Sequence, residues 1–174
     1  MLLSRRNLLG ASCATAAAFV SPRLASADVY PAKPVRVIVP FAAGGPNDLA
    51  ARLIAQGLSD SLGKQFYVEN IGGAGGNVGT GQASRAAPDG YTLIAVAPSF
   101  AANPALFDSV PYDPAKSFDA VTLAATAPTI LTVHPSVPAT TVAELIAAIK
   151  ATPGKYSYAS PGTGTPPHLL GELF

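Results

Sequence analysis

Short apolar segments rich in β-branched residues alternate with amphipathic segments along most of this chain. The strand-like segments are bounded by Gly, Pro, Asn or Asp, and they cover 35–41, 66–70, 91–97, 129–135 and 156–160. Apolar residues at helical spacing follow the first of these segments over 49–62 and recur over 142–150. Strands that alternate with helices indicate βαβ units and a mainly parallel sheet that is buried on both faces. The sequence therefore predicts the α/β class.

Shorter patterns predict the remaining elements. We expect helices over 82–86 and 102–107 and an extended segment over 118–125. Thr141 and Glu144 have the spacing of a capping box at the start of the helix over 142–150. The apolar pattern of the last residues is typical of a helix that has just begun, so we expect a fragment of a longer domain.

Composition and charge exclude several classes of protein. The chain has 174 residues, which suits one ordinary domain or two small ones, and 49% of them are apolar, so global disorder is excluded. A formal charge of +1 argues against a general nucleic-acid binder. A single Cys excludes a disulfide framework and a Cys-based zinc site. We expect neither a cofactor nor a metal.

The first 27 residues have the three parts of a secretory signal peptide. Arg5 and Arg6 precede an apolar run over 8–20, and small residues follow up to Ala27, where we expect cleavage. The run is too short to cross about 30 Å of hydrocarbon as a helix. The paired arginines resemble a twin-arginine export signal, and a Sec signal is the alternative. A lipid anchor at Cys13 is a weaker alternative.

Three loops rich in Gly, Ser, Thr or Asn are the candidates for a binding site. They cover 42–48, 71–79 and 160–168, and each follows a predicted strand and opens a predicted helix. In an open α/β sheet such loops lie together at the carboxyl edge, where ligands bind. The free N–H groups of a helix's first turn, with the positive dipole end, bind anions. The alternative is that these are ordinary turns and helix caps.

The candidate ligand contacts lie in these loops or just after the third strand. They are Gly44, Gly45, Asn47, Asp48, Asn77, Ser99, Ser160, Gly162, Thr165 and His168. Asp48 has two alternative roles, because it can complement the helix dipole or reach a ligand group such as an ammonium. His168 has two as well, a hydrogen bond at a helix start or a contact with the ligand.

Enzyme motifs fit the sequence poorly. The glycine-rich segment 72–79 does not match G-x-G-x-x-G, since Val78 takes the place of the third glycine, and it lacks the Lys-Ser/Thr of a P-loop. Ser99 is not in a G-x-S-x-G elbow. We therefore expect no catalytic residue. Two alternatives to a binding protein stay open: an exported α/β hydrolytic enzyme, and a truncated remnant without function.

A series of motifs, in order over 30–174, resembles the Bug-type solute-binding proteins of tripartite tricarboxylate transporters. No single motif is specific, but the series is. The motifs are YPxKPVRVIVPFxAGGxxD at 30–48, VEN at 68–70, GAGGNxG at 73–79, APDGYTL at 87–93, NPAL at 103–106, PYDP at 111–114, VAEL at 142–145 and YASxGxGTxxHL at 158–169.

The resemblance implies the fold of a type II-like periplasmic binding protein, a two-lobed clamp around a small carboxylate. Family members are longer, so this chain matches their first half. By that analogy the first lobe covers 28–126, and 127–174 begins the second lobe. The resemblance also implies a periplasmic location and two partners, a small carboxylate ligand and the membrane subunits of the transporter. We expect a monomer. It implies no nucleic acid.

The same resemblance implies binding without bond-making. The ligand carboxylate would lie against the N–H groups of Gly44, Gly45 and Asn47, with Asn77 and Ser99 at the same edge. Residues of the loop 160–168 would close from the second lobe by a hinge motion. The pair Pro166-Pro167 departs from the family pattern and removes two N–H donors there.

Overall fold

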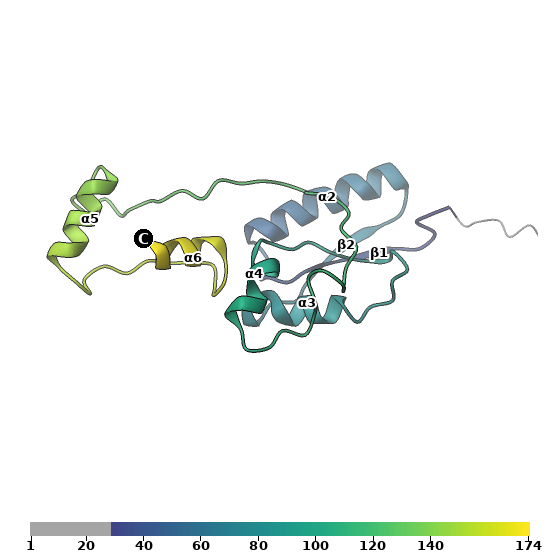
Figure 1. Cartoon of the computed structure of the whole chain (residues 1–174). Helices are drawn as coiled ribbons and strands as arrows, with labels where there is room; N and C mark the ends of the chain where they lie inside the picture. Colours follow the sequence, from purple (N-terminus) through teal and green to yellow (C-terminus); the bar gives the residue numbers. More distant parts are fainter. Residues whose placement is uncertain (1–28) are drawn as a thin grey trace, which may run out of the picture. The chain divides into compact units, whose positions relative to one another are not determined.

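The computed structural model describes residues 29–174, and the predicted signal peptide with its cleavage site after Ala27 lies outside them (Figure 1). Strands and helices alternate through the first part of this range. The elements are β1 (Val35–Val39), α2 (Pro46–Leu62), β2 (Phe66–Asn70), the 3-10 turn η1 (Ala74–Gly76), α3 (Asn77–Ala83), β3 (Thr92–Ile94), α4 (Ser99–Leu106), α5 (Val142–Ala151) and α6 (Pro166–Leu173).

The three strands form one parallel sheet in the order β2-β1-β3. Val37 in the central strand pairs with Val68 on one side and with Leu93 on the other. Parallel neighbours need a crossover, which α2 supplies between β1 and β2. The predicted α/β class and parallel sheet are confirmed.

Helices cover both faces of the sheet. In Figure 1, α2 runs above the strands and α3 runs below them. The core on the α2 face consists of alternate residues of β1 with small residues of α2 and the first residue of β2, namely Val35, Val37, Val39, Ala51, Ala55 and Phe66. Side chains alternate along a strand, so Ile38, which is fully buried, points to the opposite face.

Local signals explain where the first helices begin and end. Pro46 is the first residue of α2, where its missing N–H costs nothing, and Gly63 ends the helix in the left-handed conformation. The helices predicted over 49–62 and 102–107 begin earlier than expected, since α2 begins at Pro46 and α4 covers Ser99–Leu106. The helix predicted over 82–86 is also wrong in its bounds, since α3 covers Asn77–Ala83. Its glycines lower helix propensity, but Gly79 lets the helix approach Pro40 and Ile71 closely, and this tertiary packing prevails.

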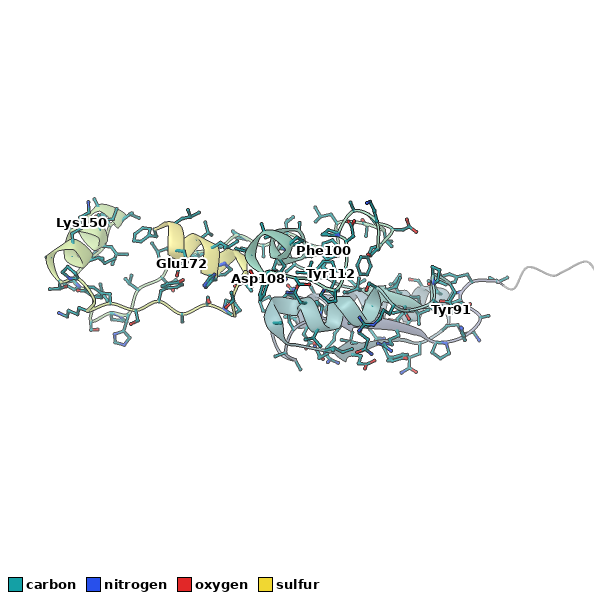
Figure 2. All side chains as sticks on the ribbon, turned by 60° about the horizontal axis from the view of Figure 1, so that its bottom comes forward. Tyr91, Phe100, Asp108, Tyr112, Lys150 and Glu172 are labelled. Carbon is teal, nitrogen blue, oxygen red and sulfur yellow. The ribbon has the colours of Figure 1, made fainter. Side chains whose placement is uncertain are left out.

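The helix α4 contains Pro104, which has no N–H for the carbonyl of Phe100. The hydroxyl of Tyr112 donates to that carbonyl oxygen over 3.1 Å. The rings of Phe100 and Tyr112 also stack with centroids 5.3 Å apart, and they lie side by side in Figure 2. The loop after α4 therefore satisfies a carbonyl that the proline leaves without its helical donor.

The two later helices also follow local signals. The capping box predicted for α5 is confirmed, because Glu144 N donates to Thr141 Oγ1 and Thr141 N donates to Glu144 Oε2, both over 3.2 Å. The helix indicated at the end of the sequence is α6. Within residues 29–174, none of the helices has the length and apolar character that a membrane span requires.

Two strand predictions are wrong, since the segments 129–135 and 156–160 form no strand. Two others are wrong in their bounds, since β1 and β3 are shorter than the predicted 35–41 and 91–97. A strand needs a neighbour to accept its backbone hydrogen bonds, and within the described range no segment pairs with 129–135 or 156–160. An apolar, β-branched sequence indicates a tendency to form a strand but cannot supply the partner.

Candidate functional site

The loops that follow the three strands leave the sheet at one edge. Because β1, β2 and β3 are parallel, the chain continues from Val39, Asn70 and Ile94 at the carboxyl edge of the sheet. The helices α2, η1–α3 and α4 begin after these loops. This edge is the usual ligand site of open α/β sheets.

The first two glycine-rich loops are in contact. Asn70 Nδ2 donates to the carbonyl oxygen of Phe41 over 3.2 Å. A Cβ on Gly72 would lie 3.6 Å from Ala42 N, and a Cβ on Gly76 would lie 3.4 Å from the carbonyl oxygen of Pro40. Glycine therefore allows the two loops to approach backbone to backbone.

The third loop reaches the second loop and α4. A Cβ on Gly75 would lie 2.9 Å from the carbonyl oxygen of Thr163. A Cβ on Gly164 would lie 2.8 Å from Asn103 Oδ1. The backbone carbonyl leaves no room for a side chain at Gly75, and Gly164 has a φ of 79°, which favours glycine. The three loops that the sequence singles out thus lie next to one another.

A shallow hollow with no room for a water molecule lies beside the second of these loops. Its lining comes from the end of β1, η1, α3 and the start of α4, namely Pro40, Phe41, Gly75, Gly76, Thr80, Val96, Ala97, Ser99, Phe100 and Asn103. Ser99 belongs to the predicted contacts; it is 2% exposed, and its hydroxyl makes no hydrogen bond within residues 29–174. Asn103 Oδ1 is buried there and receives no hydrogen bond from the described residues.

Asp48 is engaged by protein groups. Its Oδ2 accepts hydrogen bonds from Gly44 N over 2.8 Å and from Arg52 Nε over 3.0 Å, and its Oδ1 accepts one from Asn70 Nδ2 over 2.9 Å. These bonds, first that from Arg52, lower the pKa of Asp48 to about 2. The carboxylate is therefore ionised at neutral pH and is held by its own loop.

Of the three backbone N–H donors that the sequence predicts near the start of α2, one already donates to a side chain of the protein. The N–H of Gly44 is occupied, since it donates to Asp48. Gly45 is the N-cap residue, and the first helical bond runs from Leu49 N to the carbonyl oxygen of Gly45 over 3.0 Å. The N–H of Asn47 precedes that bond and has no acceptor within the helix. Gly45 and Asn47 thus keep donors at the edge of the sheet.

Asn77 has a role within the protein. Its Oδ1 accepts hydrogen bonds from Asn103 Nδ2 over 2.7 Å and from the hydroxyl of Tyr112 over 3.2 Å. Asn103 Nδ2 also donates to the carbonyl oxygen of Gly75 over 3.0 Å. Burial raises the pKa of Tyr112, so its hydroxyl remains a donor at neutral pH. Asn77 therefore joins the second loop to α4.

The predicted residues of the third loop are bonded mainly to one another. Thr165 Oγ1 donates to the carbonyl oxygen of Gly162 over 2.6 Å, and His168 Nδ1 accepts a long hydrogen bond from Gly164 N at 3.5 Å. Ser160 and Gly162 are half-buried. The loop has a defined conformation at the start of α6.

Sequence reasoning missed four polar residues that hold the site, namely Arg52, Asn70, Asn103 and Tyr112. Arg52 had a local signal, because Asp48 and Arg52 are separated by one helical turn, where opposite charges pair. The others bond to residues that are distant in the sequence. They occur in the motifs VEN, NPAL and PYDP, but the sequence indicated no role for them.

The groups at this edge are of the kind that bind anions. They are backbone N–H groups at the start of α2 and the hydroxyl of Ser99, which lines the shallow hollow. No His or carboxylate within residues 29–174 bonds to Ser99, and no group of three His, Cys, Asp or Glu there is arranged to hold a metal.

Two relatives illustrate the similarity in sequence. The chain is 40% identical to protein BugT of Bordetella pertussis over 151 residues, which are 86% of this chain and 46% of BugT. It is 39% identical over 157 residues to a UPF0065 protein from the TAR-I ttuE-ttuC' intergenic region of Agrobacterium vitis, which covers 90% of this chain and 45% of that protein. The chain thus spans about half the length of these relatives.

Solved structures show the same fold. Rpa4515 of R. palustris, solved with adipate, matches with a TM-score of 0.75 and 36% identity over 78% of this chain and 46% of its own. The periplasmic binding protein BugD matches with a TM-score of 0.68 and 34% identity over 83% of this chain and 48% of its own. MatC of Rhodopseudomonas palustris, solved with bound malate, matches with a TM-score of 0.63 and 37% identity over 70% of this chain and 42% of its own.

BugD is a periplasmic binding protein, so the fold implied by the resemblance is confirmed for the part that the chain covers. The family model described as "Tripartite tricarboxylate transporter family receptor" matches residues 50–174. The chain belongs to the tripartite tricarboxylate transporter receptor family.

Proposed function

We propose that the chain forms the first lobe and the start of the second lobe of a solute-binding protein. This protein captures a small carboxylate in the periplasm and delivers it, unaltered, to the membrane subunits of a tripartite transporter. One observation carries the proposal: the first and the third glycine-bearing loops both contact the second, which lines a shallow hollow at the carboxyl edge of a parallel sheet. The adipate and malate held by two related structures support a carboxylate as the ligand class.

The ligand carboxylate is bound by the N–H groups of Gly45 and Asn47 and by the hydroxyl of Ser99. Backbone donors at a helix N-terminus stabilise a negative charge without a counter-ion. Gly44 and Asp48 hold the first loop through the bond between them, and Asn77 holds the second loop. The third loop, through Ser160, Gly162, Thr165 and His168, closes on the ligand from the other side.

Closure follows a hinge between two lobes, with the first lobe over 28–126 and the second beginning at 127. Clamps of this kind trap a ligand by domain rotation. The chain is exported with a leader of the twin-arginine type that is removed after Ala27, and it works as a monomer. It is a binding protein without turnover, because none of the bases in the described part of the chain bonds to Ser99.

Isothermal titration calorimetry of the whole chain tests this proposal. The ligands are adipate and malate, and an uncharged diol of similar length serves as the negative control. We expect heat with a carboxylate and none with the diol, and nuclear magnetic resonance of the recovered ligand should show it unchanged. Absence of heat with every carboxylate would contradict the proposal, as would a chemically altered ligand.

Ser99→Ala locates the site. Loss of one hydrogen bond to a charged group should weaken carboxylate binding by about 10- to 100-fold. Ser157→Ala is the matched control, because Ser157 is exposed and forms no side-chain hydrogen bond within the described residues. Equal affinities of the two variants would show that the carboxylate binds elsewhere.

A further inference from the structure

Three polar side chains from α2 and β2 meet behind the loop that joins β1 to α2. Asp48 is central to them, and its side chain is only 5% exposed. One carboxylate oxygen accepts from Gly44 N and Arg52 Nε, and the other accepts from Asn70 Nδ2. Protein donors therefore approach both oxygens of Asp48, which leaves it poorly placed to act as a ligand contact.

Asn70 extends these contacts to the start of the loop. It is the last residue of β2, and its backbone pairs with Val39 at the end of β1. Its Nδ2 also donates to the carbonyl oxygen of Phe41 over 3.2 Å, and its Oδ1 accepts from Arg52 Nη2 over 3.0 Å. The loop is thus held at Phe41 near its start and at Gly44 in its middle.

The loop needs such support because its own sequence leaves it free. Gly44 has a φ of 83°, in the left-handed region, and Gly45 follows it directly. Two adjacent glycines allow many backbone conformations, and each conformation aims the N–H groups differently. A loop that must present donors in one direction therefore gains from side chains that select one conformation.

Charge gives a second reason for the arrangement. A buried carboxylate near an anion site would repel the anion, but the guanidinium of Arg52 lies 3.0 Å from Asp48 and offsets its charge. Arg52 is half-exposed, so it neutralises Asp48 from the side of the helix without filling the hollow. The charges of Asp48 and Arg52 therefore sum to zero, and the backbone dipoles dominate the electrostatic field at the loop.

We propose that Asp48, Arg52 and Asn70 are positioning residues that fix the loop between β1 and α2 and keep the N–H groups of Gly45 and Asn47 aimed at the ligand. We call these three residues the loop brace. The inference rests on the proposed function for the identity of the ligand. The hold of the loop brace on the loop is a property of the unliganded protein and is measured separately.

Hydrogen exchange of the Gly44 amide measures that hold directly. In the parent protein this amide should exchange slowly, because it donates to a buried carboxylate. Arg52→Gln leaves Asp48 with fewer donors and should speed exchange at Gly44 by about tenfold or more. Gln56→Ala, one helical turn further along α2, is the matched control and should leave Gly44 unchanged. Amides in the middle of α2 should be unchanged in both variants.

Asn70→Ala is the second variant and removes the bonds to both Phe41 and Asp48. It should speed exchange at Gly44 and weaken carboxylate affinity by about tenfold or more, as a loosened loop presents its donors less well. Glu69→Gln is its control, since Glu69 precedes Asn70 in β2 but pairs with Arg36 instead. The control should keep both the exchange rate and the affinity of the parent.

The outcomes separate the two proposals. Unchanged exchange at Gly44 in Arg52→Gln would overturn the loop brace, whether or not Asn70→Ala folds. Faster exchange with unchanged carboxylate affinity would overturn the positioning role and leave the proposed function standing. If the parent binds neither adipate nor malate, the proposed function fails, and the exchange rates still decide whether the three residues hold the loop.

Discussion

Gly79 lies where α3 packs against the backbone that follows β1 and β2. A Cβ at this position would lie 2.4 Å from the carbonyl oxygen of Ile71 and 3.0 Å from Pro40 Cα. Both neighbours are backbone atoms, so they cannot move aside as a side chain would. We expect Gly79→Ala to lower the free energy of unfolding by about 1–3 kcal/mol or more, measured by urea denaturation.

Gly57→Ala is the matched control for that measurement. Gly57 lies inside α2, and a Cβ there would meet nothing within 4 Å. Alanine is the better helix former, so this variant should be more stable than the parent by about 0.5–1 kcal/mol. If the two variants shifted stability in the same direction, the account of close packing at Gly79 would be wrong.

Asp48 makes stability depend on pH in a defined window. The pKa of Asp48 falls from 3.8 to about 2 in the folded protein, so folding favours the ionised form. Its contribution is present in full above the unfolded pKa and is lost as pH falls from about 4 through about 2. Asp48→Asn should show a weaker loss of stability over that range in urea denaturation. An identical pH dependence in parent and variant would contradict this assignment.

Predictability at the scale of residues depends on sequence separation. Pro46 at the start of α2 and the Asp48–Arg52 pair are local signals, although the apolar pattern alone placed the helix start at residue 49. The bond from Asn70 to Asp48 joins residues 22 positions apart, and that from Tyr112 to Asn77 joins residues 35 apart. Their pairing depends on the fold. From the sequence alone, Asp48 therefore had two alternative roles, and Asn77 was expected to contact the ligand rather than the protein.

At the scale of elements, α4 depends on a side chain outside it. The single hydroxyl proton of Tyr112 is shared between the Phe100 carbonyl that Pro104 leaves unsatisfied and Asn77 Oδ1. Tyr112 is only 8% exposed, so water cannot easily replace its hydroxyl. We expect Tyr112→Phe to lower the free energy of unfolding by about 1–3 kcal/mol in urea denaturation.

Tyr67→Phe is the control for the hydroxyl of Tyr112. Tyr67 is 41% exposed, and its hydroxyl forms no hydrogen bond within residues 29–174. The control should change stability by no more than about 0.5 kcal/mol. A Tyr112→Phe variant as stable as this control would show that the hydroxyl of Tyr112 does not support α4.

Elements were predictable where their stabilising contacts are local. The strand over 66–70 has the expected bounds. The helix α5 begins where expected because its capping box sets its start, and it ends one residue later than predicted. The start of α3 was missed because Asn77–Ala83 contains two glycines, and close packing overrides their low propensity. The strands expected over 129–135 and 156–160 need partners, and the described residues provide none.

At the scale of the whole molecule, the α/β class and the parallel sheet follow from the alternation of apolar and amphipathic segments. The contact between the first two loops was also predictable, because parallel strands bring successive loops to one edge. The third loop follows no strand in the described range, so its contact with the second loop did not follow from this argument. The boundary between lobes at 126 and 127 stays a prediction. The chain spans about half the length of its relatives, so the binding activity of the whole receptor is a proposal for this chain.

The central claim is that helix N-termini at the carboxyl edge of the sheet capture a carboxylate. The most direct measurement is a titration of the isotopically labelled chain with adipate, followed by the amide resonances of each residue. The account predicts that the largest shifts occur at Gly45, Asn47 and Ser99 and that they saturate together. Shifts that instead gather around α5, or that spread evenly over the chain, would contradict it.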